Sequence, residues 1–436
     1  MRSRLLTLLL FVIVTTAGTS LILRSLGVRL NRTGVEPLIW FVEGRQGGDS
    51  WRPALTALQV ADTLQLRSKG LYEKVFFQAR VPHKGFQYPP TALLPIRAAR
   101  AAAGNDAYTA LAVVNWLSIP VLILSVLFLL RRSEPPGALD RALLVLVVIC
   151  ATLLFYPAMR AYRNGQMQAW INALFAVALA AYAGNRPRLS GACLALAAMI
   201  KPQLGLFAVW AALRRQPAML VTFVLVLAAG VAATAFWLGP APFVGYVDVL
   251  QYIARRGETF YPNQSVNGFM NRLVGNGSSI DFGDSMPEPN ALVSLVTGVG
   301  SLLLLLVALA PARRARGDAP SPADFAFMGL IATLASPIAW EHHYGVLLPA
   351  FALLARSFLE GGLHGGRRWL AAIAWTLTAN SWEAANVFAD TPLRFLQSTL
   401  LAGVLCLAVA LRLSWSGPGS DRLDAQPEQG QRGSVV

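Results

Sequence analysis

Long apolar segments follow one another along almost the whole chain, and they constrain its fold more than any other feature. Their approximate bounds are 5–25, 107–130, 140–158, 168–184, 189–200, 203–213, 217–238, 291–311, 323–337, 345–359, 368–388 and 394–412. A helix needs about 20 apolar residues to cross the hydrocarbon core of a bilayer. Because backbone groups in a bilayer must satisfy their own hydrogen bonds, the segments predict an all-α polytopic membrane protein with about 10–13 transmembrane helices.

The scarcity of charged residues supports a membrane protein over a soluble one. Only 14% of the residues are charged, whereas soluble domains carry about 25% charge. The formal net charge is +15, but the basic residues form small clusters between apolar segments, without a nucleic-acid-binding motif. We therefore expect membrane lipids, and no nucleic acid, as partners. Cys150, Cys193 and Cys406 all lie inside apolar segments, which argues against a disulfide framework.

The basic clusters predict the orientation in the membrane. Arg2 and Arg4 precede the first apolar segment, which we interpret as a retained span because no clear cleavage site ends it. They place the N-terminus in the cytoplasm. Further clusters fall at every second junction: Arg131 and Arg132, Arg186 and Arg188, Arg214 and Arg215, Arg313 to Arg316, Arg367 and Arg368, and the start of the tail at Arg412. This alternation makes 189–213 a hairpin whose tip lies on the outer side.

The chain is expected to form one membrane domain, 1–412, followed by a disordered cytoplasmic tail, 413–436. Two large loops, 26–106 and 239–290, fall on the outer side. The first is far longer than most loops, and loops of that length are usually functional. Within it, the pattern predicts a helix at 53–69 and an interfacial or re-entrant segment at 91–104.

Six polar stretches fall on the same predicted outer side. Polar groups near membrane spans are costly and therefore indicate function. The stretches contain Asp49 in GGDSW, Tyr88 in FQYPP, Arg160, Arg163, Asn164 and Gln166 in RAYRNGQMQ, Lys201 in MIKPQ, Arg272 in NQSVNGFMNRL, and Trp340, Glu341, His342 and His343 in SPIAWEHHY. A catalytic cavity at a membrane surface requires such a converging set, although ordinary outer loops would also supply one.

The order of four short motifs resembles glycosyltransferase family 87. They are GFQYPPTALL after GLYEKVFF, then NGQ, then KPQ, then SPIAWEHHY. Each motif is common by itself, so the resemblance depends on their order and spacing. It implies a GT-C-like fold with a large first extracytoplasmic loop in a bacterial cell membrane. It also implies inverting transfer of a sugar, with mannose favoured, from a polyprenyl-phosphate donor to a glycolipid or glycan acceptor on the extracytoplasmic face.

The resemblance assigns the catalytic base to an acidic residue in the first outer loop. Asp49 follows the first span most closely, whereas Asp62 fits the family's spacing to the glycine before Leu71 and Tyr72 better. We favour Asp49 and leave Asp62 as the alternative. An inverting transfer needs one base to take the proton of the acceptor hydroxyl as that oxygen attacks the sugar.

The other polar residues receive two roles. Lys201, His343, His342 and Arg163 are expected to contact the donor phosphate, with Arg160 as a further cation of the same kind. The residues expected to bind substrate are Tyr88, Asn164, Gln166, Arg272, Trp340 and Glu341. The alternatives are a lysine reaching toward lipid headgroups, arginines that anchor the protein to them, and a structural turn at Asn164.

The histidine pair does not predict a metal site. Adjacent residues of a helix point about 100° apart, so two neighbouring histidines do not face one ion. Zinc needs three or four ligands, and we expect neither a metal nor another cofactor. One histidine, with His343 favoured, would contact the phosphate.

A transporter or lipid flippase is the alternative function. It would require broken helices and charged groups near the middle of the bilayer. Here the polar groups gather at one face and the halves of the chain show no repeat, which favours an enzyme.

Overall fold

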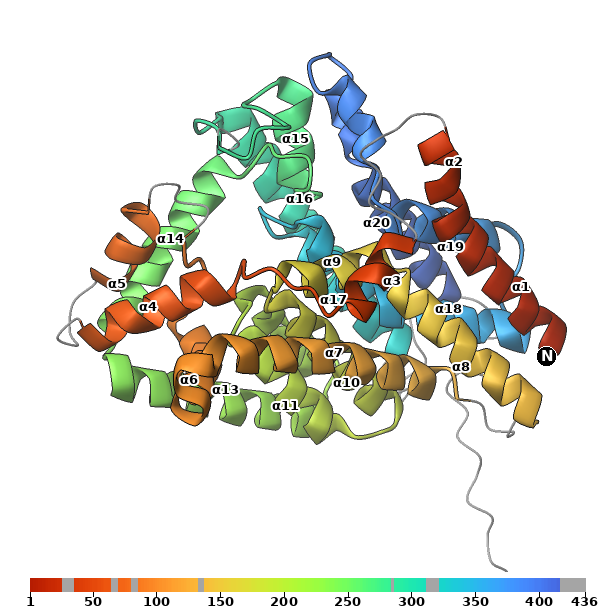
Figure 1. The fold of residues 1–436 in the computed structure, drawn as a ribbon, viewed down its shortest axis with the longest axis horizontal. Coiled ribbons are helices and arrows are strands. Elements are labelled where there is room, and N and C mark those ends of the chain that lie inside the picture. Colours follow the sequence, from red (N-terminus) through yellow and green to blue (C-terminus); the bar gives the residue numbers. More distant parts are fainter. Residues whose placement is uncertain are drawn as a thin grey trace, which may run out of the picture.

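A computed structural model describes residues 1–25, 35–63, 70–79, 85–131, 137–283, 286–310 and 321–415. In chain order its α-helices are α1 (Arg2–Ile13), α2 (Thr19–Ser25), α3 (Val35–Val42), α4 (Trp51–Thr63), α5 (Gly70–Tyr72), α6 (Leu93–Ala103), α7 (Ala107–Leu129), α8 (Ala138–Leu153), α9 (Tyr156–Asn164), α10 (Gln168–Ala183), α11 (Pro187–Ala198), α12 (Leu206–Leu213), α13 (Pro217–Leu238), α14 (Ala241–Arg256), α15 (Val266–Val274), α16 (Ala291–Leu309), α17 (Pro322–Leu334), α18 (Leu348–Glu360), α19 (Gly365–Thr378) and α20 (Thr399–Trp415) (Figure 1). The 3-10 helices are η4 (Pro90–Ala92), η5 (Gly104–Asp106), η6 (Pro202–Gly205), η7 (Glu341–Leu347), η8 (Glu383–Phe388) and η9 (Arg394–Gln397), and η1 (Val14–Gly18) and η2 (Glu73–Phe77) are π-helical. These residues contain no strand, which confirms the all-α fold.

Every predicted apolar segment coincides with a helix, but the helices differ in length. Among the described residues, four runs are long and apolar enough to cross a membrane: Arg2–Leu23, Pro90–Leu129, Pro217–Leu238 and Ala291–Leu309. The pair α8 and α9, bent by 58°, would make a fifth. This confirms a polytopic membrane protein. The expected 10–13 spans would have to include shorter apolar helices such as α10 and α17, which cannot cross a bilayer of about 30 Å by themselves.

The outward surfaces of the long helices are apolar. Phe236 on α13 is 96% exposed, and Leu10 on α1, Leu225 on α13 and Leu295 on α16 are also exposed. Apolar patches of this size on a soluble monomer would be unusual. They are the surface that a helix presents to lipid tails.

The helix in the predicted apolar segment 368–388 ends earlier than expected. Helix α19 stops at Thr378, and α20 begins only at Thr399. Asn380 turns back and donates to the carbonyls of Thr15 and Thr376, both at 2.8 Å. These polar groups end the helix, and the connection up to Thr399 contains only the short turns η8 and η9.

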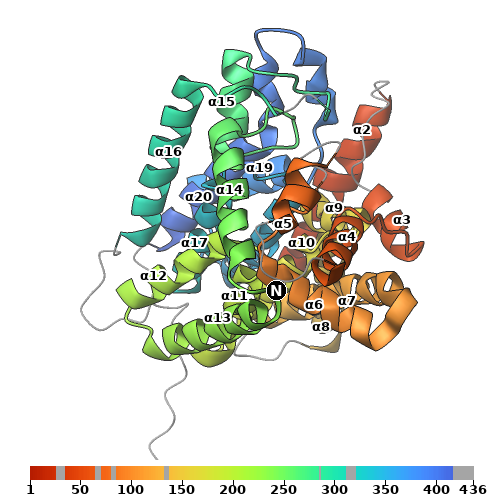
Figure 2. The same cartoon turned by 90° about the vertical axis from the view of Figure 1, so that its left-hand side faces the viewer.

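Helix α9 occupies the middle of the molecule because α8 bends directly before it. Tyr156 and Pro157 begin α9, with the proline in the first turn, where its missing N–H costs nothing. Figure 2 shows α9 and α10 between a group formed by α15 and α16 on one side and α3, α4 and α7 on the other. The turn η7 packs against both α9 and α10. This places the polar residues of α9 next to the Glu-His-His stretch.

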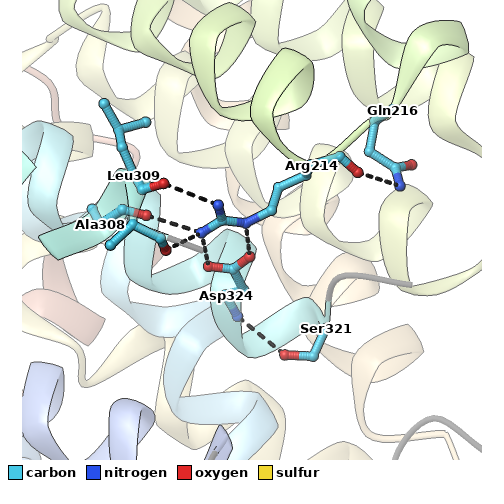
Figure 3. A network of polar contacts seen from close by, with 7 residues as sticks. Arg214, Gln216, Ala308, Leu309, Ser321 and Asp324 are labelled. Atoms are coloured by element: carbon cyan, nitrogen blue, oxygen red, sulfur yellow. Dashed lines mark hydrogen bonds and ion pairs between the residues drawn. The ribbon is translucent and has the colours of Figure 1, made fainter. Parts of the chain in front are cut away.

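A buried ion pair joins three helix ends elsewhere in the fold (Figure 3). Arg214, at the end of α12, donates from Nε and Nη2 to the carboxylate of Asp324 at 2.7 and 3.2 Å. Its guanidinium also donates to the last carbonyls of α16, those of Ala308, Leu309 and Ala310. Asp324 lies in the first turn of α17, whose N-cap is Ser321. The pair therefore holds α12, α16 and α17 together.

Candidate active site

The glycines of the motifs GGDSW and RNGQ are adjacent in space. The loop before α4 runs along the end of α9, so that the N–H of Asp49 donates to the carbonyl of Asn164 at 3.0 Å and that of Ser50 to Gly165 at 3.1 Å. Gly165 has a φ of +66° and ends α9 in the left-handed conformation. A Cβ on Gly47 would lie 2.8 Å from the carbonyl oxygen of Asn164, and one on Gly165 would collide with that of Gly47. Only glycine permits this contact.

We expect Gly165→Ala to destabilise the protein much more than Gly44→Ala. Both glycines have a positive φ, so each alanine incurs about 1–2 kcal/mol of backbone strain. A Cβ at Gly44 meets nothing within 4 Å, whereas one at Gly165 meets the backbone of Gly47. Thermal unfolding of the purified variants measures the difference. Equal melting temperatures would mean that the two segments are not packed together.

Three motif residues form a hydrogen-bonded cluster beside Asp49. Oε1 of Gln166 accepts from Ser50 Oγ at 2.9 Å and from the Tyr88 hydroxyl at 3.0 Å. Nε2 of the same amide donates to Asp49 Oδ2 at 3.5 Å. The structure thus brings GGDSW, QYPP and NGQ to one place, although 78 residues separate Tyr88 from Gln166.

Asp49 and Asp62 lie in different surroundings. The Asp49 side chain is accessible to solvent, yet nearby protein atoms desolvate its carboxyl and raise its pKa, against the lowering effects of Gln166, Arg160 and Arg52. Asp62 lies on the exposed side of α4 near its end, about 16 Å along the axis from Trp51. Only Asp49 touches the motif residues.

Arg160 and Arg163 on α9 have different neighbours. Arg163 lies over the ring of Trp40, 5.7 Å from its centroid. Arg160 interacts electrostatically with Asp49 and with Glu341. Of the two arginines, Arg160 is therefore the one whose charge acts on both the first outer loop and η7. A phosphate contact by Arg163 stays a prediction.

The Glu-His-His stretch forms the turn η7. The hydroxyl of Tyr156 donates to Oε2 of Glu341 at 3.3 Å. The rings of His342 and His343 are 4.6 Å apart and nearly perpendicular, at 86°. Burial, followed by the charge of Lys201, lowers the pKa of both histidines well below its usual value. Both rings are therefore neutral at neutral pH and can serve as hydrogen-bonding groups.

His343 is held more firmly than its neighbour. Its Nδ1 accepts the backbone N–H of Trp340 at 3.2 Å, and its ring stacks on the Trp340 indole at an angle of 17°. The Trp340 indole N–H in turn donates to Glu258. Trp340 thus orients the histidine pair.

Lys201 lies between the end of α11 and the start of η6. Its ammonium is completely covered, and among the described residues it has no hydrogen-bond partner. Burial lowers the pKa of Lys201 well below its usual value. Its charge acts on both His342 and His343, so it faces the same region as η7. A buried cation without a counter-charge is costly and favours an anionic ligand.

The placement of Arg272 does not support the expected contact with substrate. Its side chain is completely buried, and all five of its N–H groups donate to protein oxygens: the hydroxyl of Ser398, twice, and the carbonyls of Thr259, Phe260 and Asn263. With no donor left over, Arg272 holds its own loop in shape. Asn164 also contributes through its backbone, because its carbonyl receives the N–H of Asp49.

Comparison with known proteins identifies the family. The model of glycosyltransferase family 87 matches residues 86–337, more than half of the chain. The chain belongs to glycosyltransferase family 87. It is therefore a glycosyltransferase, and the resemblance in its motifs is confirmed. Neither the curated proteins nor the solved structures contain a match.

The site of this family 87 member extends beyond the matched region. Asp49 precedes residue 86 and His342 follows residue 337. The structure nevertheless places both within electrostatic reach of Arg160, and His342 within reach of Lys201, which lie inside the match. The match and the two flanking stretches thus meet in one polar cluster.

Two carboxylates in the cluster were not singled out from the sequence. Glu383 lies in the predicted apolar segment 368–388, yet it is buried beside Arg160 and Tyr261 because α19 ends before it. Glu258 is fully buried and receives the N–H of Trp340. A carboxylate in or beside an apolar segment is itself a signal of a functional site, and this signal could have identified Glu383.

Family 87 membership does not by itself imply a metal, and the described side chains offer no set of ligands for one. No group of three or more His, Cys, Asp or Glu residues in this part of the chain is arranged to hold an ion. His83 lies outside the described residues.

An apolar cavity of about 210 Å³ lies away from this cluster, between α1, α7, α8, α18 and α19. Its lining contains no carboxylate. The rings of Phe351 and Trp375 at its wall pack against Phe155, with centroids 6.1 and 5.4 Å from the Phe155 ring, and Phe155 directly precedes α9. The cavity therefore lacks the groups that sugar transfer needs, and the polar cluster is the candidate active site.

Proposed function

We propose that this family 87 member is an inverting glycosyltransferase whose donor is a polyprenyl-phosphate sugar, with mannose favoured. The acceptor is a glycolipid or glycan, and the transfer takes place on the extracytoplasmic face of a bacterial cell membrane. The N-terminus then lies in the cytoplasm. Asp49 is the general base, and Lys201 with the neutral histidines receives the phosphate.

The observation that carries this proposal is that a candidate base and candidate anion-binding groups all interact with Arg160. Arg160 interacts electrostatically with Asp49, Glu341 and His342. The charge of Lys201, which has no hydrogen-bond partner among the described residues, acts on both histidines. A base and an anion-binding group are thus presented to one region, which is what transfer from a phosphate leaving group requires.

The reaction follows from these roles. Asp49 takes the proton of the acceptor hydroxyl while its oxygen attacks the anomeric carbon from the face opposite the phosphate. The bond between that carbon and the phosphate oxygen breaks, and the electron pair leaves with the polyprenyl phosphate. Lys201 and one histidine stabilise the added negative charge. The raised pKa of Asp49 makes its carboxylate a stronger base.

We expect Lys201→Met to lower kcat/KM for transfer by about 10- to 100-fold, the usual effect of losing a charged hydrogen bond. The same substitution should leave the melting temperature unchanged or raise it, because it removes an unpaired buried cation. Exposed Lys74 on η2 provides the matched control, Lys74→Met, which should change neither quantity. Normal turnover in Lys201→Met would remove Lys201 from the mechanism.

The function itself can be tested with sealed membrane vesicles that contain the protein. Radiolabelled polyprenyl-phosphate mannose, supplied with a lipid extract as the source of acceptor, should lose its label to a new product. Vesicles of opposite orientation should differ, with activity only where the extracytoplasmic face is exposed to the donor. Movement of intact donor across the membrane without a product would instead indicate a flippase.

A further inference from the structure

Gln166 makes contacts that differ from those expected for a sugar-binding amide. Its side chain is buried, and its carbonyl oxygen lies within hydrogen-bond distance of two hydroxyls, Ser50 Oγ at 2.9 Å and that of Tyr88 at 3.0 Å, which are themselves 2.8 Å apart. These two hydroxyls flank the amide oxygen, so a sugar hydroxyl would have to displace one of them to reach it.

The two hydroxyls also fix which way the amide points. Ser50 Oγ accepts the backbone N–H of Met167 at 3.1 Å and lies 2.8 Å from the Tyr88 hydroxyl. Whichever of these two hydroxyls donates to the other, the second still donates to Oε1 of Gln166. A flipped amide would place its oxygen beside the Asp49 carboxylate, with acceptor facing acceptor. Only the observed orientation satisfies every group, and in it Nε2 faces Asp49 Oδ2 at 3.5 Å. Hydrogen bonds in unliganded sites are often long in this way.

We infer that Gln166 is a positioning residue for Asp49, and that Ser50 and Tyr88 clamp its amide in the orientation that presents N–H to the carboxylate. The inference rests on the proposed function only in calling Asp49 the base. The clamp explains why three distant motifs meet here. It also gives the serine of GGDSW a function, because Ser50 is completely buried and joins the N-terminal loop to α10.

The Gln166 amide should stabilise the charged form of Asp49. The other groups that face this carboxyl are Arg52 from α4 and Arg160 from α9, with the Tyr88 hydroxyl nearby. A donated N–H stabilises a carboxylate relative to the neutral acid. Removing the Gln166 amide must therefore raise the pKa of Asp49, while both arginines remain in place.

The test is a pH titration of Asp49 in the purified full-length protein by difference infrared spectroscopy. The band of its protonated carboxyl is identified by its loss in Asp49→Asn. We expect Gln166→Met to raise the titration midpoint by about one pH unit. Ser50→Ala and Tyr88→Phe should each give a smaller rise, because one hydroxyl still holds the amide. Gln168→Met is the control for the titration midpoint, since Gln168 is buried two residues away and donates to Asn172 and to the carbonyl of His343 instead of to Asp49.

Each outcome separates the clamp from the proposed function. An unchanged midpoint in Gln166→Met would overturn the clamp, even if Asp49→Asn abolished transfer. Lower turnover with an unchanged midpoint would return Gln166 to sugar binding. Full turnover in Asp49→Asn would instead refute Asp49 as the base, while the infrared titration would still test the contact. If Gln166→Met does not fold, Tyr88→Phe carries the same test.

Discussion

Asp49→Asn should lower kcat/KM for sugar transfer by about 10²- to 10⁴-fold, the usual contribution of a positioned general base. Asparagine keeps the shape and can still contact Gln166, but it cannot take a proton. The fold should survive, because the backbone N–H groups of residues 49 and 50 would still bind Asn164 and Gly165. The measurement is initial rates with a polyprenyl-phosphate mannose donor and the purified enzyme. Donor affinity should change much less than turnover.

Asp62→Asn distinguishes the two acidic residues of the first outer loop. Asp62 is exposed near the end of α4, eleven residues after Trp51, so its replacement should leave the rate within about twofold, as for ordinary surface changes. If instead Asp62→Asn abolished transfer and Asp49→Asn did not, the base would lie on α4.

Asp324→Asn should lower the free energy of unfolding by about 3 kcal/mol, which is large for a single substitution. Its carboxylate is 1% exposed and binds Arg214 with both oxygens. Without it, the guanidinium stays buried beside three carbonyls that cannot balance its charge. The ends of α12, α16 and α17 then lose their shared contact. Unfolding in a mixture of detergent and SDS, followed by circular dichroism, measures the loss.

Two further variants test whether the loss of stability in Asp324→Asn arises because the ion pair is buried. Glu360→Gln removes the partner of Arg356 in a partly exposed ion pair within one helix, and such pairs contribute about 0.3–0.5 kcal/mol. Replacing both members together, Arg214→Met with Asp324→Leu, should cost less than Asp324→Asn alone, because no unpaired charge remains. Equal losses for Glu360→Gln and Asp324→Asn would contradict a special role for the buried pair.

The positions of the helices could be predicted well, because each follows from the apolar residues of its own segment. Each of the twelve apolar segments contains a helix, and the ends of α7 and α13 agree closely with prediction. The prediction of one continuous segment over 368–388 was wrong, because its apolar residues outweighed the polar Asn380 and Glu383 in the average hydropathy. Those polar groups find partners in distant parts of the chain, such as the carbonyl of Thr15, and a local pattern does not contain that information.

The candidate site was predictable as a set of residues but not as an arrangement. The motifs identified Asp49, Lys201 and the histidines. They could not choose between Arg160 and Arg163, which are three residues apart on α9 and lie within about 60° of each other around a helix. The choice depends on what each side chain meets: the ring of Trp40 for Arg163, and the charges of Asp49 and Glu341 for Arg160.

The sequence by itself determined that the chain is a helical membrane protein with a family 87 motif order, because both follow from composition and from spacing along the chain. The tertiary structure decided which polar groups receive partners. The amide N–H of Gln166 faces Asp49, and Arg272 binds carbonyls of its own loop, while Lys201 has no hydrogen-bond partner in the described part of the chain. The reason is that several of these contacts join segments far apart in the chain: Gln166 meets Tyr88 and Ser50, 78 and 116 residues away, and Arg272 meets Ser398, 126 residues away. Such segments come together only when the helices pack, so a local sequence pattern does not contain their contacts.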